Sequence, residues 1–233
     1  MITVVEPRFF WPETTLKMFP FLMEHIEICG RVCYRSEDKI TDGSAERFVK
    51  MINKSGHHSV LEHFSITAIV VCSRACSHQL VRHRISSFSQ ESMRYCNYGK
   101  DDSLQVICPP SIGLEPGDYV FENDGLWRNG ILYIPPFSPG KLTRWVSQID
   151  SAYQEYKAEL KNGVKPEDAR YVLPNATKTK LAVTFNVRSW LHFFKMRCDK
   201  HAQWEIRGIA NSILNDLSRR FPSVFIDSSV PGS

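Results

Sequence analysis

The chain has 233 residues, of which 42% are hydrophobic and 23% are charged, and its formal net charge is +4 at pH 7. These proportions are typical of a folded globular protein, and they exclude the disordered, collagen-like and coiled-coil classes. The charge excess is too small for a protein that wraps nucleic acid, although it favours anionic ligands.

The first quarter of the chain predicts a short strand followed by helices. Residues 2–12 indicate the strand and a turn after it, and the apolar positions of residues 16–26 indicate a helix that Pro20 disturbs. Ser44 is expected to cap a helix that ends at Ser55-Gly56. Its apolar positions recur with helical spacing at Ala45, Phe48, Val49 and Ile52.

Residues 59–108 predict alternating short elements. A helical turn is expected at residues 59–62, where the spacing is that of a capping box, and a β-branched strand follows over residues 64–72. Residues 73–83 predict a helix, residues 85–90 a loop, and residues 104–108 a strand.

Residues 109–140 contain six prolines and five glycines among aromatic residues, and we expect an irregular insertion there. The next segment predicts a long helix that stops at Asn162-Gly163. Its apolar stripe consists of Leu142, Trp145, Val146, Ile149, Ala152, Tyr153, Tyr156 and Leu160.

The last quarter predicts a brief helix after Pro166, a strand over residues 181–185, and helices over residues 189–198 and 201–221. Such a mixture of elements indicates an α/β or α+β fold. We find no repeat or compositional boundary, so we expect one domain over residues 1–233, with a flexible tail at residues 222–233.

The longest apolar run falls far short of the roughly 18 to 20 residues that a membrane helix needs, and the amino terminus carries no secretory pattern. We therefore expect a soluble, cytoplasmic protein without a membrane partner. The seven cysteines include no CxxC pair, and we expect them to be reduced and mostly buried.

The densest functional signal is Arg82-His83-Arg84, followed by Ser92 and Arg94. Guanidinium groups bind phosphate bidentately, and neighbouring hydroxyls add donors, so the pattern predicts a phosphorylated ligand. The alternative is a solvated basic surface loop.

A second cluster comprises Arg170, Asn186, Arg188, His192, Arg197 and His201. Arg197 and His201 would share one face if their helix is continuous. The alternative is that Arg188 and Arg197 are ordinary surface charges of a helix.

A third group, His57, His58, Glu62 and His63, suggests a metal site. It lacks the HExxH spacing that places two ligands on one helical face, so we expect no metal here.

Three ordered segments resemble the flavin-dependent thymidylate synthases (ThyX). The family signature is RHR, seven residues and then serine, and Arg82-His83-Arg84 with Ser92 fits it without a gap. Residues 55–63 are similar to the upstream histidine motif of the family, and residues 197–207 to its downstream block. The resemblance is close over residues 57–95 and 170–221 and thin over residues 1–35, and we place no counterpart for residues 109–140.

The resemblance implies an α/β subunit with a mixed sheet flanked by helices, assembled into a homotetramer whose active sites are shared between subunits. It also implies a methyltransferase that converts dUMP to dTMP, with methylenetetrahydrofolate as carbon donor and NADPH as reductant through bound FAD. All these ligands are anionic, which suits the clustered arginines.

Carried over residue by residue, the resemblance implies that the two clusters form one site. The residues expected to contact FAD are Ser59, Arg82, His83, Arg84, Gln90, Asn186, Arg188 and His192. The residues expected to bind dUMP are Gln79, Arg82, Gln90, Glu91, Ser92, Arg94, Arg170 and Arg197. The residues expected at the reacting centre are Arg197 and His57.

Three positions depart from the usual family pattern. Gln90 stands where Glu is frequent, His192 where Asn is frequent, and Glu91 where an apolar residue is usual. Gln90 and His192 keep a hydrogen-bonding side chain, so the departures concern the detail of the contacts. The sequence offers no explanation for Glu91.

For the reaction, we expect Arg197 to stabilise the negative charge that builds on the uracil ring when C5 becomes nucleophilic. Arginine is too basic to remove a proton. Ser92 is expected to bind phosphate rather than to act as a nucleophile, because neither Glu91 nor Met93 is an obvious base for it.

Other functions remain open on the residues alone. Arg82, Arg84 and Arg94 interleave with Phe88 and Tyr95, as in a strip that stacks and neutralises single-stranded nucleic acid. A metal-dependent phosphate hydrolase built on the third group and a relative that keeps the fold without catalysis are further possibilities.

Overall fold

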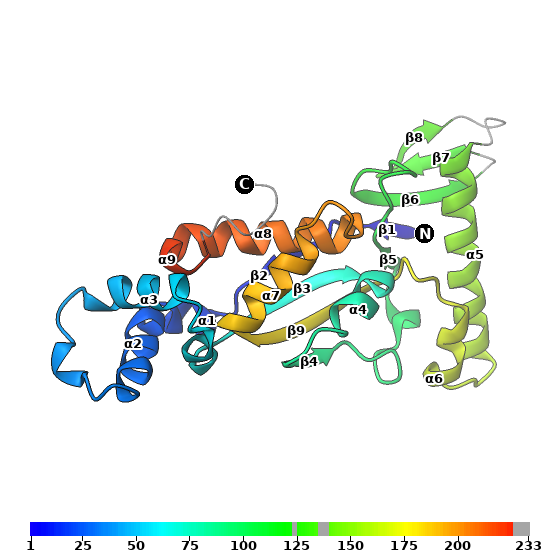
Figure 1. The fold of residues 1–233 in the computed structure, drawn as a ribbon. Helices are drawn as coiled ribbons and strands as arrows, with labels where there is room; N and C mark the ends of the chain where they lie inside the picture. The colour runs from blue at the N-terminus through cyan, green and yellow to red at the C-terminus, as the bar shows by residue number, and fades with distance from the viewer. Residues whose placement is uncertain (123–124, 135–139, 226–233) are drawn as a thin grey trace. The chain divides into compact units, whose positions relative to one another are not determined.

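The computed structural model describes residues 1–122, 125–134 and 140–225. The chain divides into two compact units, each assembled from three separate segments (Figure 1). The first unit comprises residues 1–7, 71–78 and 90–180, and the second comprises residues 8–70, 79–89 and the segment from residue 181 onward. Helices and strands are mixed throughout, which confirms the α/β fold class. The expectation of one domain over residues 1–233 stays a prediction.

The first unit contains a five-stranded sheet of order β5-β1-β6-β7-β8. Its strands are β1 (Ile2–Val4), β5 (Leu104–Val106), β6 (Gly117–Glu122), β7 (Gly125–Arg128) and β8 (Ile131–Ile134). β1 runs parallel to β5 and antiparallel to β6, so that Ile2 lies opposite both Leu104 and Tyr119. All three side chains are buried in the core of this unit.

Helix α5 (Lys141–Lys161) packs against β1 and β6 in the first unit, as the ribbon also shows (Figure 1). Its predicted stripe is confirmed, because Val146, Tyr153 and Tyr156 are fully buried. The helix ends at the expected place, with Asn162 as C-cap and Gly163 in the left-handed region at φ 84°. The shorter helical elements of this unit are η4 (Tyr98–Lys100), α6 (Pro166–Ala169), η5 (Arg170–Val172) and α4 (Arg74–Leu80), whose last two residues belong to the second unit.

The second unit is built on a four-stranded sheet of order β2-β3-β9-β4. Its strands are β2 (Arg8–Phe10), β3 (Ser65–Ser73), β9 (Lys178–Asn186) and β4 (Ser86–Gln90). Residues 71–73 of β3, 178–180 of β9 and Gln90 of β4 belong to the first unit. Buried side chains alternate with half-buried or exposed ones along β9, as the strand period of two requires.

Helix α7 (Val187–Arg197) is fixed to this sheet by a buried aromatic cluster. The indole N–H of Trp190 donates to the carbonyl of Ile66 at 3.1 Å, and the Trp190 ring lies 4.6 Å from that of Phe185. Helix α8 (Trp204–Arg220) packs against α7. The orientation of α7 is therefore set by its buried face.

The remaining helices of the second unit come mostly from the first quarter of the chain. They are α1 (Glu13–Met18), η1 (Phe19–Phe21), α2 (Leu22–Val32), η2 (Glu37–Lys39), α3 (Ser44–Lys54), η3 (His58–His63) and α9 (Pro222–Phe225). The predicted disturbance at Pro20 is confirmed, since it lies in η1 between α1 and α2. Helix α3 packs against both α2 and α9.

Two expectations about irregular segments are wrong. Residues 86–90, expected as a loop, form the edge strand β4, in which serines occupy exposed positions that need no apolar side chain. Residues 109–140, expected as irregular, contain the antiparallel strands β6, β7 and β8. Gly130 serves a turn there: it and the preceding Asn129 both have positive φ between β7 and β8. Residues 123–124 and 135–139 of that segment lie outside the described residues.

Three smaller expectations also need correction. The N-cap of α3 is Gly43, at φ 71°, because the Ser44 hydroxyl instead donates to Glu27 at 2.7 Å. Residues 222–225 are helical with Val224 and Phe225 buried, so they are not a flexible tail, and residues 226–233 lie outside the described residues. Helix α7 ends before Cys198, so Arg197 and His201 do not share a continuous helix.

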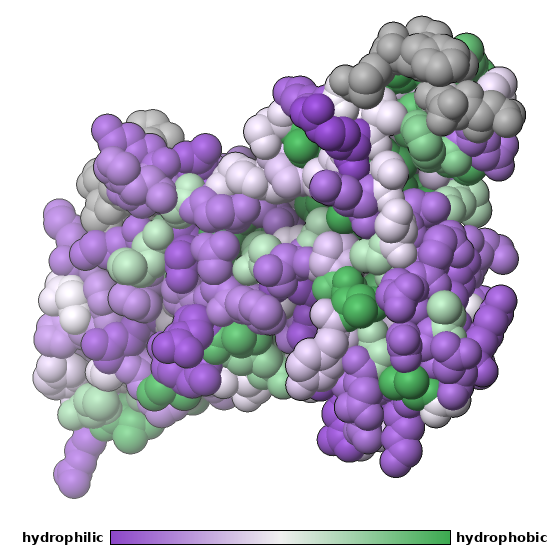
Figure 2. Space-filling view, turned by 90° about the vertical axis from the view of Figure 1, so that its right-hand side faces the viewer, coloured by the Kyte–Doolittle hydropathy of each residue, from purple (hydrophilic) through white to green (hydrophobic). Residues whose placement is uncertain are grey.

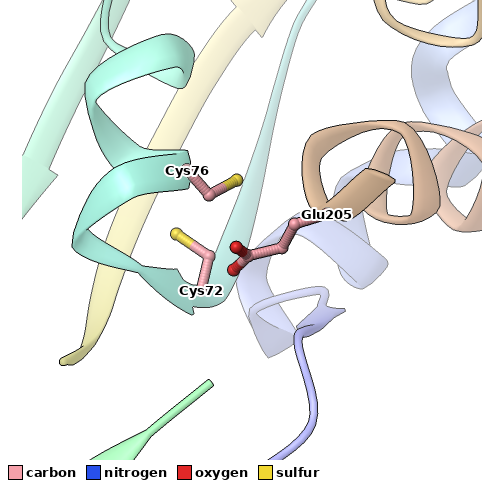
Figure 3. A group of neighbouring side chains, drawn as sticks. All are labelled: Cys72, Cys76 and Glu205. Atoms are coloured by element: carbon pink, nitrogen blue, oxygen red, sulfur yellow. The ribbon is translucent and has the colours of Figure 1, made fainter. Parts of the chain in front are cut away.

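The seven cysteines are thiols rather than disulfides, as expected. Only Cys72, Cys76 and Cys198 are buried, so the expectation that most would be is wrong. Cys72 and Cys76 lie on either side of the junction between β3 and α4 (Figure 3).

None of the described helices has the length and apolarity needed to cross a membrane. The face drawn in Figure 2 is mostly hydrophilic, with apolar residues gathered in small groups.

Candidate functional site

The Arg82-His83-Arg84 motif extends the end of α4 as a tight turn. The backbone N–H of His83 donates to the carbonyl of Leu80 at 3.2 Å. The Arg84 guanidinium folds back on the same turn and donates to the carbonyls of Val81 and His83, at 2.6 and 2.8 Å. Arg82 and Arg84 are exposed, whereas His83 is half-buried.

His83 faces the buried side of the second unit and meets α7 there. Its ring packs edge-on against Phe193, with ring centres 5.0 Å apart, and lies 6.5 Å from the ring of His192. The Arg197 Nε–H donates to His83 Nε2 at 2.8 Å. The structure thus brings together parts of two clusters that lie 114 residues apart in the sequence.

The hydrogen bond from Arg197 defines the protonation state of His83. Arginine carries only donors, so the Nε2 atom of His83 must be an unprotonated acceptor. Burial lowers the pKa of His83 to about 4, assisted by the positive charge of Arg197 and by His192. At neutral pH, His83 is therefore a neutral imidazole that holds the guanidinium of Arg197 in place.

The N-terminal end of α7 carries two more candidate residues. Asn186 is the N-cap, and its Oδ1 accepts the backbone N–H of Ser189 at 2.8 Å. Arg188 is exposed and forms a 2.5 Å ion pair with Glu62 of η3. Glu62 was a member of the possible metal group, and here it balances an arginine instead.

Element η3 packs against α7 and carries the upstream histidine motif. His57 is its exposed N-cap, and Ser59 is also exposed. The His58 ring lies 3.3 Å from the carbonyl of Asn53. His57 and Ser59 thus present their side chains to solvent, on an element that contacts the helix of Arg188 and His192.

The expected nucleotide residues from Gln90 to Arg170 belong to the first unit. Gln90 donates through Nε2 to the buried hydroxyls of Ser77 and Thr179, at 3.0 and 3.2 Å, and therefore offers its Oε1 as an acceptor. Ser92 starts a turn: its carbonyl accepts from the N–H of Cys96 at 2.8 Å, and its Oγ accepts from the N–H of Arg94 at 3.2 Å.

Glu167 connects two arginines that the sequence separates widely. Its carboxylate accepts from Arg94 Nε at 2.9 Å, and its carbonyl accepts from Arg170 Nε at 2.9 Å. The pair with Arg94 is largely exposed, so its role is to orient rather than to stabilise strongly.

Arg170 lines a pocket of about 270 Å³ together with Arg74, His78, Met93 and Tyr171. Arg74 and His78 were not among the candidates from the sequence. The sequence feature that could have identified them is their spacing of four residues within α4, which places both basic side chains on one face of the helix. Two guanidinium groups and an imidazole give the pocket the chemistry of an anion site.

A larger pocket of about 550 Å³ lies between α2 and α3 in the second unit. Its lining includes the carboxylates of Glu24, Glu27, Asp42 and Glu46. Those groups would repel an anionic ligand, so we do not place the reaction there.

Residues 20–223 match the family model described as thymidylate synthase complementing protein. The chain is 37% identical over 214 residues to the flavin-dependent thymidylate synthase of Geobacter sulfurreducens, covering 89% of this chain and 82% of that protein. It is 34% identical over 196 residues to the enzyme of the same name from Pyrococcus furiosus, covering 84% and 71% of the two chains.

Among solved structures, the fold is similar to that of a UMP/dUMP methylase, PolB from Streptomyces cacaoi, bound with 5-Br dUMP. The TM-score is 0.69, and the match covers 96% of this chain and 95% of that chain. The sequence identity is 23%, so this likeness concerns the fold.

Proposed function

The chain belongs to the flavin-dependent thymidylate synthases, a family of methyltransferases, and from this premise we propose the reaction and the roles of its residues. The reaction is the reductive methylation of dUMP to dTMP. The carbon donor is methylenetetrahydrofolate, and NADPH is the reductant through FAD.

The observation that carries the proposal is the 2.8 Å hydrogen bond between Arg197 and His83. Surface arginines of a helix are mobile and solvated, whereas this guanidinium is half-buried and oriented by a neutral imidazole. A charge fixed in this way suits the stabilisation of negative charge that develops on a substrate.

The residues of the second unit fit FAD. The exposed guanidinium groups of Arg82, Arg84 and Arg188 supply donors for phosphate oxygens. The Oδ1 of Asn186 caps α7, so its Nδ2 is the group that can donate to a ligand. The set that the family resemblance assigns to FAD is Ser59, Arg82, His83, Arg84, Gln90, Asn186, Arg188 and His192, and all of these except Gln90 belong to the second unit.

The nucleotide is held by residues of both sequence clusters. Ser92 and Arg94 bind its phosphate through a hydroxyl and a guanidinium, and Arg170, in its basic pocket, adds a further cation. The set that the family resemblance assigns to dUMP is Gln79, Arg82, Gln90, Glu91, Ser92, Arg94, Arg170 and Arg197. Arg74 and His78 join it as lining residues of the Arg170 pocket.

Bound FAD supplies the reducing equivalents for the reaction. Arg197 stabilises the negative charge on N3 of uracil and its flanking oxygens, which makes C5 nucleophilic. His83 keeps Arg197 oriented by accepting from its Nε–H. His57, exposed at the start of η3, is proposed to lie near the flavin.

Two observations weaken the other functions suggested by the sequence. The net charge of +4 is small for a protein that binds nucleic acid along a basic strip. In the possible metal group, Glu62 pairs with Arg188 and the His58 ring lies against the Asn53 carbonyl.

We also propose a homotetramer that shares its active sites between subunits. Apolar side chains around α2 support this assembly, because Phe21, Val32 and Tyr34 are 61%, 60% and 76% exposed. Light scattering after size exclusion tests it, and a monomer of 26.8 kDa would contradict it. The cytoplasmic location is proposed from the seven thiols, which suit a reducing compartment.

The test of the proposed function is the visible spectrum of the purified chain, incubated with FAD and desalted, before and after addition of dUMP. We expect retained flavin bands that shift with the nucleotide, and dTMP formation that requires both methylenetetrahydrofolate and NADPH. A colourless protein that forms no dTMP would refute the proposal.

Replacement of Arg197 with Ala separates its role from that of the flavin site. We expect turnover to fall about 100- to 1000-fold while FAD stays bound. Arg219→Ala is the matched control, because Arg219 is 79% exposed and pairs with Asp216 on α8. Near-normal turnover of the Arg197 variant would contradict the assignment.

A further inference from the structure

Glu91 is the residue that the sequence left unexplained, and its side chain points into the first unit. Its Oε1 accepts from the Tyr98 hydroxyl at 2.8 Å, and its Oε2 pairs with Lys178 Nζ at 3.2 Å. The side chains of Glu91 and Lys178 are only 17% and 20% exposed. This carboxylate is thus held by two partners away from bulk solvent.

The backbone of Glu91 is fixed to the same region of β9. Its N–H donates to the carbonyl of Lys180 at 2.9 Å, two residues from the lysine that pairs with its carboxylate. Main chain and side chain therefore tie residue 91 to one short stretch of a strand. A residue held in both ways has little freedom to rotate.

The other end of the segment is fixed through Tyr98. Its ring is buried in the core of the first unit, and its carbonyl accepts from the Tyr153 hydroxyl of α5 at 2.9 Å. The carboxylate of Glu91 thus connects the start of the segment directly to its anchored end.

Ser92 and Arg94 lie between these two fixed points. Their turn is closed by the hydrogen bonds from the Cys96 and Arg94 N–H groups to Ser92. Met93, the residue between them, is buried in the core of the unit, and Arg94 pairs with Glu167. If Glu91 released Tyr98 and Lys178, the turn would keep these contacts and its internal bonds but lose the side-chain attachment next to Ser92. The position of the hydroxyl and the guanidinium would then be less well fixed.

A direct contact between the Glu91 carboxylate and the nucleotide is unfavourable. The carboxylate would have to leave Lys178 uncompensated, and a largely buried charge without its partner is costly. It would also approach the dianionic phosphate with a like charge. Burial and the Glu91 carboxylate both raise the pKa of Tyr98, so its hydroxyl stays a donor to Glu91.

We infer that Glu91 is a positioning residue, which acts through Tyr98 and Lys178 to hold Ser92 and Arg94 in place for the phosphate of the nucleotide. The inference rests on the proposed function, because it takes Ser92 and Arg94 as phosphate ligands. It replaces the expectation that the Glu91 side chain contacts dUMP.

The test compares Glu91→Ala, Glu91→Gln, Lys178→Met and Tyr98→Phe, with Glu115→Gln as control for an exposed paired carboxylate of the same unit. In each FAD-loaded variant, dUMP is titrated by the flavin spectrum, and kcat and KM are measured. We expect Glu91→Ala to raise the KM for dUMP about 10-fold, with FAD retention close to that of the parent. The melting temperature should fall, because Lys178 and the Tyr98 hydroxyl lose their partner, so the KM values are compared at a temperature at which every variant is folded.

Two comparisons test the positioning role specifically. Lys178→Met and Tyr98→Phe should raise the KM for dUMP in the same direction, and the Glu91→Gln, Lys178→Met double variant should be less impaired than the product of the two single effects. Glu91→Gln should be milder than Glu91→Ala, since its amide oxygen still accepts from Tyr98.

Three outcomes would overturn the inference. In the first, Glu91→Ala has a KM for dUMP within twofold of that of the parent, although Ser92→Ala and Arg94→Ala each raise the KM. Another is a rise in Glu91→Ala that Lys178→Met and Tyr98→Phe do not share, which would indicate direct contact. If Ser92→Ala and Arg94→Ala also leave dUMP binding unchanged, the phosphate site of the proposed function fails with it.

Discussion

Replacing His83 with Leu should slow thymidylate formation without unfolding the chain. Leucine has a similar volume and keeps the contact with Phe193, but it removes the Nε2 acceptor of the Arg197 Nε–H. The guanidinium keeps its charge and loses its orientation. The change therefore isolates the effect of holding Arg197 from the effect of its charge.

The size of the effect follows from this one hydrogen bond. A hydrogen bond with a charged partner contributes about 1.5 to 3 kcal/mol, and about 1.4 kcal/mol corresponds to a tenfold change. Both residues are half-buried, so water replaces part of the lost interaction and the lower end applies. We expect kcat to fall about 10- to 30-fold.

The assay is dTMP formation at saturating FAD, dUMP and methylenetetrahydrofolate, so that a change in flavin affinity does not enter the rate. His83→Gln should recover part of the loss, because its amide oxygen can accept from Arg197. His201→Leu is the matched control, since His201 is 80% exposed and pairs with Asp199 beyond the end of α7.

A double-mutant cycle decides whether His83 acts through Arg197. In the Arg197→Ala background, His83→Leu should lower the rate by less than about twofold, because the group it orients is gone. An equal cost in both backgrounds would refute the reasoning, as would a normal rate in His83→Leu alone.

Three further predictions concern the same unit. The folded pKa of His83, about 4, lies below the ordinary 6.5, so the unfolded chain binds more protons between these values. The stabilisation from neutral His83 should be complete above pH 6.5 and lost towards pH 4. In urea unfolding, the free energy of unfolding should fall less between pH 7 and pH 4.5 for His83→Gln than for the parent chain. Equal decreases in the two chains would contradict the prediction. Arg188→Ala should change the free energy of unfolding by less than about 1 kcal/mol, since the side chains of Arg188 and its partner Glu62 are 54% and 41% exposed. The same change should weaken FAD retention. Unchanged flavin retention after desalting would remove Arg188 from the FAD set. Trp190→Ala should destabilise the fold by about 3 to 5 kcal/mol in denaturant unfolding, because the ring is fully buried, and a loss below about 1 kcal/mol would contradict its role in fixing α7.

The elements that the sequence predicted best are those whose apolar residues recur at helical spacing. The sequence located the C-terminal end of α5 to within about one residue, because the apolar stripe of the helix is long and Gly163 terminates it. Helix α3 was found for the same reason, although its cap was assigned to Ser44 rather than to Gly43. Periodicity therefore located helices well and their first residues less well.

The strands β4, β6, β7 and β8 were missed because their signals are weak or masked by turn residues. β4 is rich in serine and lies at a sheet edge, where polar side chains are tolerated. The Asn129-Gly130 pair between β7 and β8 was the usable signal for a hairpin, and it was read as part of an irregular segment.

The candidate site was predictable as a set of residues but not as a set of contacts. The bond between His83 and Arg197 joins positions 114 residues apart, and that between Glu91 and Lys178 joins positions 87 residues apart. Composition and spacing carry no information about such pairings, since they depend on how the sheets order their strands.

Helix α7 has Asn186 at its N-cap and Arg197 as its last residue, and Trp190 fixes the face between them. At about 1.5 Å and 100° per residue, its eleven residues set both the separation and the relative direction of these two ends. Removing or inserting one residue within α7 would rotate Arg197 by about 100° relative to Asn186. In the evolution of this chain, changes of length should therefore accumulate in surface loops, while the length of α7 stays constant.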